Sequence, residues 1–189
     1  MSAPTHTQTI AGMEISHLDI PGLIILTPRV FADDRGLFYE LWNQERYREA
    51  GIALPFVQDN FSRSKRGTLR GMHIQNPLPQ GKLAMVLEGE IFDVAVDLRR
   101  DSPTYGRWHG ELLSAQNKRQ MYVPPGFAHG FVAMSETALF LYKCTEYYSP
   151  QHELILKWDD PEVGIQWPIQ LPLLSPKDQH GLRLRDLPL

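Results

Sequence analysis

The sequence lacks several features that would place the protein in a secreted, membrane-bound or disulfide-stabilised class. It has one cysteine among 189 residues, Cys144, so no disulfide can form within the chain, and a reducing compartment fits this usage. No apolar run approaches the roughly 18 residues that a membrane-spanning helix requires. The N-terminus has neither a basic start nor an apolar core, so it does not resemble a secretory signal. We therefore expect a cytoplasmic protein that does not bind membranes.

The sequence also lacks a strong excess of either positive or negative charge. The formal net charge is −3, with acidic and basic residues interspersed along the chain. This balance argues against nucleic acid as a partner, because such proteins usually carry a strong basic patch. The sequence contains no glycine-rich phosphate loop. Any anion site must therefore be built from a few local arginines and lysines.

Helix signals are scarce and strand signals are frequent. The clearest helix is predicted for Asn43–Ala50, which opens on a residue suited to capping and ends before a glycine. Turn-forming clusters separate many short apolar segments, which favours a sandwich or closed barrel. The predicted strands are Leu23–Thr27, Leu37–Trp42, Phe56–Ser62, Leu69–Gln75, Lys82–Leu87, Ile91–Leu98, Arg107–Leu113, Arg119–Val123, Gly130–Met134 and Ala138–Tyr142.

The pattern indicates one all-β domain over residues 1–189, with the first fifteen residues as a flexible extension. From Phe92 to Asp97 apolar and other residues alternate, which is typical of a half-buried strand. The stretch from Pro161 onward carries several prolines and no clear periodicity. We expect it to wrap the barrel and to end in a mobile tail.

Seven histidines raise the question of a metal site. Residues Pro124–Phe131 resemble the second signature motif of cupins, with a Pro-Gly turn followed by His129. Metal-binding cupins usually supply two histidines at i and i+2 on one strand, and then a glutamate. Here His73 has Gln75 as its i+2 neighbour, and residues 76–80 contain no carboxylate. Two histidines without an acidic ligand make a poor site, so we expect no metal.

The strand around His73 has a predictable orientation. In a regular strand Leu69, Gly71, His73 and Gln75 share one face. Arg70 then points to the opposite face, unless a β-bulge re-aims it.

Several segments, in order along nearly the whole chain, resemble the dTDP-4-dehydrorhamnose 3,5-epimerase family of deoxysugar biosynthesis. Only the first dozen or so residues fall outside the resemblance. It implies a cupin-type jelly-roll barrel that works without a cofactor. The matching segments are Asp34–Glu40, Phe56–Asn60, Gly67–Gln75, Gln80–Lys82, Ile91–Arg99, Pro125–Phe131 and Leu174–Asp178.

The resemblance implies a reaction and the residues that perform it. A ketone at sugar C4 acidifies the hydrogens on C3 and C5, and epimerisation removes a proton from one face and returns one to the other. By resemblance, His73 is the base and Asp178 orients it. Tyr142 is the acid on the opposite face, and Lys82 stabilises the enolate oxygen.

Each of these residues also has a purely structural interpretation. A single histidine on a strand is often a satisfied structural or surface residue. Tyr142 could belong to the core, with Tyr147 and Tyr148 as competitors for its role. Asp178 could cap a turn near Ser175, and Lys82 could be a solvated strand end. The matching segments favour the catalytic interpretation for all of them.

The resemblance also implies a binding site for a dTDP-sugar. Arg35 and Arg70 can grip diphosphate oxygens through charge-assisted hydrogen bonds. A partner subunit completes each nucleotide site in this family, so we expect a homodimer in which Arg35 serves the neighbouring chain and the strand 23–27 adds to the partner's sheet. The remaining positions carried over as substrate-binding are Glu40, Gln58, Asn60, His129, Glu153 and Lys177.

The expected reaction is conversion of dTDP-4-dehydro-6-deoxy-D-glucose to dTDP-4-dehydro-L-rhamnose. A close rival is an epimerase that acts at C3 alone, since the same residues serve both reactions. A metal-dependent cupin isomerase or dioxygenase is disfavoured because the H-x-H pair and the glutamate are missing. A non-catalytic sugar-binding cupin is disfavoured because His73, Lys82, Tyr142 and Asp178 occur together.

Overall fold

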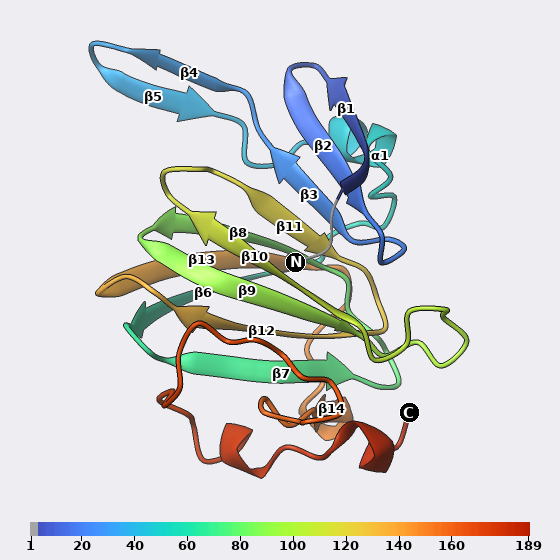
Figure 1. The fold of residues 1–189 in the computed structure, drawn as a ribbon. Helices are drawn as coiled ribbons and strands as arrows, with labels where there is room; N and C mark the ends of the chain where they lie inside the picture. Colours follow the sequence, from blue (N-terminus) through green and yellow to red (C-terminus); the bar gives the residue numbers. More distant parts are fainter. Residues whose placement is uncertain (1–3) are drawn as a thin grey trace.

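The computed structural model describes residues 4–189, and two packed β-sheets dominate it (Figure 1). The larger sheet has the strand order β1-β2-β3-β11-β8-β13-β6, and the smaller has the order β10-β9-β12-β7-β14. A separate hairpin, β4-β5, projects from the body. This is the expected all-β, cupin-type jelly roll.

The strand bounds of the larger sheet are β1 Pro4–Ile10, β2 Met13–Leu18, β3 Ile24–Thr27, β6 Gln58–Lys65, β8 Lys82–Glu88, β11 Gln120–Val123 and β13 Thr137–Cys144. Those of the smaller sheet are β7 Leu69–Gln75, β9 Glu90–Asp97, β10 Trp108–Ser114, β12 Phe127–Ala133 and β14 Glu153–Ile155. The hairpin and helices are β4 Val30–Asp33, β5 Gly36–Tyr39, α1 Gln44–Glu49, η1 Pro150–His152, η2 Asp178–His180 and η3 Leu184–Asp186.

The predicted helix and strands are present, with ends shifted by a few residues. Helix α1 is capped as expected, because the side chain of Asn43 accepts hydrogen bonds from the backbone N–H groups of Glu45 and Arg46. Strands β1, β2, β4 and β14 were not predicted. Strand β1 is mostly polar, and β4 and β14 have only four and three residues, so these strands give no clear period-two signal. Strand β2 does alternate, with Met13 and Ile15 buried and Glu14 exposed, and this signal was missed.

Strand β9 corrects one prediction, because it is buried on both faces rather than one. Asp93 and Asp97 are fully buried, as are Val94 and Val96. Ala95 packs in the core between the sheets, whereas Val94 and Val96 pack on the outer face of the smaller sheet. The carboxylates of this strand therefore point into the barrel, and its valines point outward.

The C-terminal segment covers that outer face, as expected. Leu156, Val163, Ile165, Leu184 and Leu187 bury the outward side chains of the smaller sheet. Figure 1 shows this segment running beneath β7 and β12. Its end is packed rather than mobile in the structure, since Leu187 is only 3% exposed.

The N-terminal residues form a hairpin instead of the expected flexible extension. Strand β1 pairs antiparallel with β2, which in turn pairs with β3. Residues 1–3 of the expected extension lie outside the described residues. Across the described residues 4–189 no helix is both long and apolar enough to cross a membrane.

A β-bulge in β7 re-aims Arg70. His129 of β12 pairs with His73, but Phe131, two residues on, pairs with Arg70, three residues back. The extra residue in β7 breaks the alternation of a regular strand. Arg70 and His73 consequently line the same cavity. A regular strand would have placed Arg70 on the opposite face, so the orientation is the one expected for a bulge.

Gly71 makes this bulge feasible. Its φ is +127°, and a Cβ placed there would lie 2.6 Å from the Cα of Gly130 on the neighbouring strand. A side chain at this position would be strained in its backbone and would collide with backbone atoms.

We predict that Gly71→Ala lowers the free energy of unfolding by about 2–4 kcal/mol. Gly36→Ala is the matched control, since Gly36 has φ +133° but a Cβ added there would meet no atom within 4 Å. Urea denaturation measures the free energy of unfolding of both variants. The loss in Gly36→Ala reports backbone strain alone, and the additional loss in Gly71→Ala reports the collision of the new Cβ with Gly130. Equal losses would contradict the role given to the close approach of β7 and β12.

Candidate active site

A cavity of about 610 Å³ opens between the two sheets. Its walls come from the inner faces of β6, β7, β8, β12 and β13, together with the segment that leads into η2. Ten of the twelve site residues predicted from the sequence line it. They are Gln58, Asn60, Arg70, His73, Lys82, His129, Tyr142, Glu153, Lys177 and Asp178.

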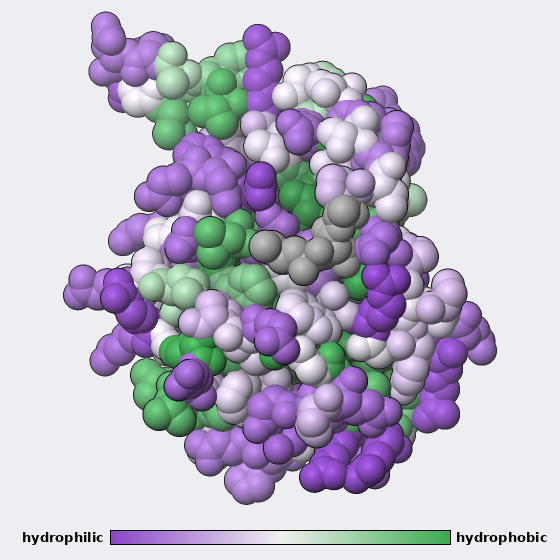
Figure 2. All heavy atoms as spheres, viewed as in Figure 1, coloured by the Kyte–Doolittle hydropathy of each residue, from purple (hydrophilic) through white to green (hydrophobic). Residues whose placement is uncertain are grey.

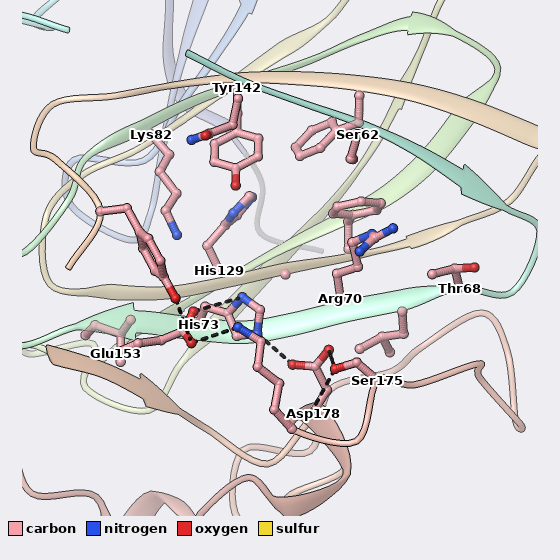
Figure 3. A pocket seen from close by; sticks show the side chains of 18 of the residues that line it. Ser62, Thr68, Arg70, His73, Lys82, His129, Tyr142, Glu153, Ser175 and Asp178 are labelled. Carbon is pink, nitrogen blue, oxygen red and sulfur yellow. Dashed lines mark hydrogen bonds and ion pairs between the residues drawn. The ribbon is translucent and has the colours of Figure 1, made fainter. Parts of the chain in front are cut away.

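His73 and Asp178 form a hydrogen-bonded pair across 105 residues of sequence. The Nε2 of His73 lies 2.6 Å from Oδ1 of Asp178, whose side chain is 3% exposed (Figure 3). With a proton on Nε2, the imidazole donates to the carboxylate, and Nδ1 is left to accept a proton. Glu153 lies 3.9 Å from that Nδ1.

Asp178 is also a turn residue. Its Oδ2 accepts a hydrogen bond from Oγ of Ser175 at 2.7 Å, and its backbone N–H donates to the same hydroxyl. Burial alone would raise the pKa of the Asp178 carboxyl, but the hydrogen bonds from His73 and Ser175 outweigh burial and lower it. The carboxylate is therefore charged and fixed in position beside His73.

Lys82 reaches the same cavity from β8. It is 9% exposed and shares the inner face of its strand with Ala84 and Val86. Burial lowers the pKa of its ammonium group, while Cys144, Asp93 and other nearby acids oppose this shift. An oxyanion placed beside this buried ammonium group would stabilise its positive charge and would itself be stabilised.

Tyr142 faces the cavity from β13, in the opposite sheet to His73. Its ring stacks on Phe140 at 5.3 Å between centroids, and it packs against the core cluster. Burial raises the pKa of its hydroxyl to about 12. Tyr142 is thus both a core tyrosine and a cavity residue, and Figure 3 shows its hydroxyl pointing inward with the side chains of Lys82 and His129.

The two competing tyrosines are placed differently. Tyr147 is 64% exposed and does not line the cavity. Tyr148 lines it at the rim, where its hydroxyl lies 3.4 Å from Glu153. Neither side chain is buried opposite His73 as Tyr142 is.

His129 has a buried partner that was not predicted from the sequence. Its Nε2 lies 2.9 and 3.0 Å from the two oxygens of Asp93, which is fully buried. His129 therefore bonds a carboxylate rather than the backbone. Asp93 was overlooked because its strand was expected to expose one face, although an acid within an apolar alternating strand is itself an unusual signal.

Further polar side chains line the cavity between His73 and the rim. Arg70 donates through Nε to Ser64 at 3.1 Å, and its guanidinium still borders the cavity. Gln58 donates to Asn60 at 3.0 Å, and Lys177 pairs with Glu153 at 2.7 Å. These groups offer donors and positive charge suited to an anionic, polar ligand.

Gln75 is fully engaged in the position where a second metal-binding histidine would be expected. Its amide nitrogen donates to the carbonyls of Leu78 and Tyr147, and its oxygen accepts from the N–H of Ser149. Within residues 4–189 no group of three His, Cys, Asp or Glu side chains is arranged to hold a metal ion.

Two predicted binding residues, Arg35 and Glu40, do not line this cavity. Arg35 lies in the turn of the β4-β5 hairpin, where its side chain is 90% exposed and pairs with Asp33. Glu40 pairs with Arg46 of α1 at 2.8 Å.

Comparison with known proteins identifies the family. The dTDP-4-dehydrorhamnose 3,5-epimerase family model matches residues 17–186. The chain is 57% identical over 176 residues to the enzyme of that name from Pseudomonas aeruginosa, covering 92% of this chain and 97% of the relative.

Solved structures agree with this match. The dTDP-6-deoxy-D-glucose-3,5-epimerase from Legionella pneumophila, in complex with dTDP-4-keto-L-rhamnose, has a TM-score of 0.90 and 50% identity, covering 93% of this chain and 94% of that one. A 3'-monoepimerase from Streptomyces bikiniensis, in complex with dTDP-quinovose, has a TM-score of 0.83 and 33% identity, covering 89% and 86%. The chain therefore belongs to the dTDP-4-dehydrorhamnose 3,5-epimerase family.

Proposed function

We propose that this protein epimerises C3 and C5 of dTDP-4-dehydro-6-deoxy-D-glucose and forms dTDP-4-dehydro-L-rhamnose, in the cytoplasm. The observation that carries the proposal is the His73–Asp178 pair, 2.6 Å apart, which faces a cavity that Tyr142 enters from the opposite sheet. This arrangement supplies a base on one side of a ligand and an acid on the other. Both are needed to invert a carbon next to a ketone.

The proton transfers follow from the geometry. Nδ1 of His73 takes the hydrogen from C3 or C5, and Asp178 stabilises the imidazolium that results. Electrons move onto the C4 oxygen, where the ammonium of Lys82 stabilises the enolate. The hydroxyl of Tyr142 then protonates the opposite face of the same carbon. No cofactor takes part in these steps.

We propose that the rim binds the nucleotide diphosphate. Arg70 and Lys177 offer positive charge, and Gln58 and Asn60 offer amide groups, all on the cavity wall. Glu153 holds Lys177 near the opening. His129 lies deeper, beside the sugar position.

We further propose a homodimer in which the β4-β5 hairpin of one chain completes the site of the other. The hairpin exposes large apolar side chains, with Phe31 at 51%, Leu37 at 55% and Phe38 at 70% exposure. Figure 2 shows hydrophobic atoms along the projecting hairpin, behind a hydrophilic tip. Arg35 at that tip could then reach a partner's diphosphate, although it does not line the cavity of its own chain.

An epimerase acting at C3 alone remains the rival function, because one similar structure is described as a 3'-monoepimerase. The same His73, Tyr142 and Lys82 would serve both reactions. The products differ at C5, so proton NMR of the product distinguishes them.

The proposed activity predicts solvent exchange at two carbons. Incubation with dTDP-4-dehydro-6-deoxy-D-glucose in deuterated water should place deuterium at both C3 and C5 without any added cofactor. His73→Ala should abolish exchange while dTDP still binds. Deuterium at C3 alone would establish the rival function, and intact substrate without exchange at either carbon would refute the proposal.

The Asp178 role predicts a graded loss of activity. Asp178→Asn should lower kcat by about 10²–10⁴-fold, because the amide no longer stabilises the imidazolium. Ser175→Ala, which removes one hydrogen bond to Asp178 and leaves its charge, is the matched control and should cost about tenfold or less. Steady-state kinetics at neutral pH checks both, and an Asp178→Asn enzyme as active as wild type would contradict the pairing.

The dimer proposal predicts a change of mass in solution. Phe38→Asp should weaken self-association, since it places a charge in an apolar interface. Arg35→Ala should leave the dimer intact and raise KM. Light scattering after size exclusion, combined with kinetics, measures both. A wild-type protein that is monomeric and fully active would contradict this part of the account.

A further inference from the structure

Epimerisation at C3 and C5 requires the acid to deliver two protons, one to each carbon, from the same side of the sugar. Tyr142 carries a single proton, so it becomes a phenolate after the first carbon is inverted. Burial raises the pKa of its hydroxyl to about 12, so the phenolate is a strong base. With substrate filling the cavity, the tyrosine needs a nearby donor before it can serve the second carbon.

The structure holds a second His–carboxylate pair next to that position. Nε2 of His129 is bonded to both oxygens of Asp93, and both residues are buried within the barrel. An unpaired carboxylate at such a site is costly, whereas an imidazolium partner compensates its charge. The pair is therefore a buried, hydrogen-bonded imidazole and carboxylate on the wall of the cavity.

His129 and Tyr142 both neighbour the ring of Phe140 and line the same cavity. In the strand pairing His129 is directly opposite His73 on β7. Its ring lies 6.3 Å from that of Phe140, on which Tyr142 stacks at 5.3 Å. In Figure 3 the Tyr142 hydroxyl points toward the His129 ring. Since Nε2 faces Asp93, Nδ1 is the ring nitrogen that is free to face the cavity.

We propose that the Asp93–His129 pair stores the second proton of the catalytic cycle and reprotonates Tyr142 between the two epimerisations. The N–H bond at Nδ1 of the His129 imidazolium breaks, and the O–H bond of Tyr142 forms. The His129 imidazole becomes neutral and regains a proton from solvent after product leaves. The imidazolium of His73, whose side chain is 25% exposed, releases its own proton to solvent before it takes the proton of the second carbon. Asp93 is a positioning residue in this scheme, because it acts through His129. The inference rests on the proposed 3,5-epimerase function.

Asp93→Asn tests the proposed proton storage, because a neutral amide does not stabilise a positive charge on His129. In a single turnover quenched over time, the variant should accumulate singly epimerised sugar, with the second epimerisation slowed about 10²-fold relative to the first. Wild type should show little of this intermediate. His129→Asn should give the same bias, and it carries the test if Asp93→Asn does not fold.

Asp97→Asn is the matched control. Asp97 is a fully buried carboxylate on the same strand, but it binds Arg99, Ser102 and Thr104 outside the cavity. This variant should lose stability without changing the ratio of the two epimerisation rates.

The possible outcomes distinguish failure of the proposed epimerase function from failure of the proposed proton storage. Wild-type enzyme that exchanges neither carbon refutes the proposed function. Wild-type enzyme that inverts both carbons, beside Asp93→Asn and His129→Asn variants that slow both steps equally or neither, overturns the proton store alone. Selective loss of the second step in both variants, with Asp97→Asn unaffected, supports it.

Discussion

The hydrogen bond between His73 and Asp178 connects the barrel to the segment that closes it. His73 belongs to a central strand of the smaller sheet, whereas Asp178 begins η2 in the C-terminal cover. The same segment buries the outer face of that sheet through Leu156, Val163 and Leu184. The segment that covers this sheet therefore also supplies the hydrogen-bond partner of His73.

The space between the sheets combines an apolar core with a few paired polar groups, and further apolar side chains pack on the outer face under the C-terminal cover. Strand β9 contributes to both layers, with Asp93 and Ala95 inside and Val94 and Val96 packed outside. Each inner acid is compensated, Asp93 by His129 and Asp97 by Arg99 and two hydroxyls. Buried charges that are paired in this way keep the cavity rigid and preorganised for charge that develops during a reaction.

Much of this arrangement could be predicted from the sequence, and the failures have physical causes. Helix α1 followed from its capping residue, and the inner residues His73, Lys82 and Tyr142 followed from family segments. Asp93 did not, because alternation alone cannot tell which face of a strand is covered by a distant segment. The face of β7 on which Arg70 lies depends on a β-bulge. The bulge accompanies the close approach of Gly71 to Gly130 on the neighbouring strand, which the local sequence pattern does not indicate. Arg35 and Glu40 were expected at the substrate but lie outside the cavity, and the family segments do not indicate their ion pairs with Asp33 and Arg46.

The central claim is that one sugar ring lies between His73 and Tyr142. A crystal structure with a bound dTDP-hexose measures this directly. The account predicts Nδ1 of His73 and the Tyr142 hydroxyl on opposite faces of the ring, each within about 3.5 Å of C3 or C5, with Nζ of Lys82 at the C4 oxygen. A ring that has both side chains on one face, or that binds outside the cavity, would contradict it.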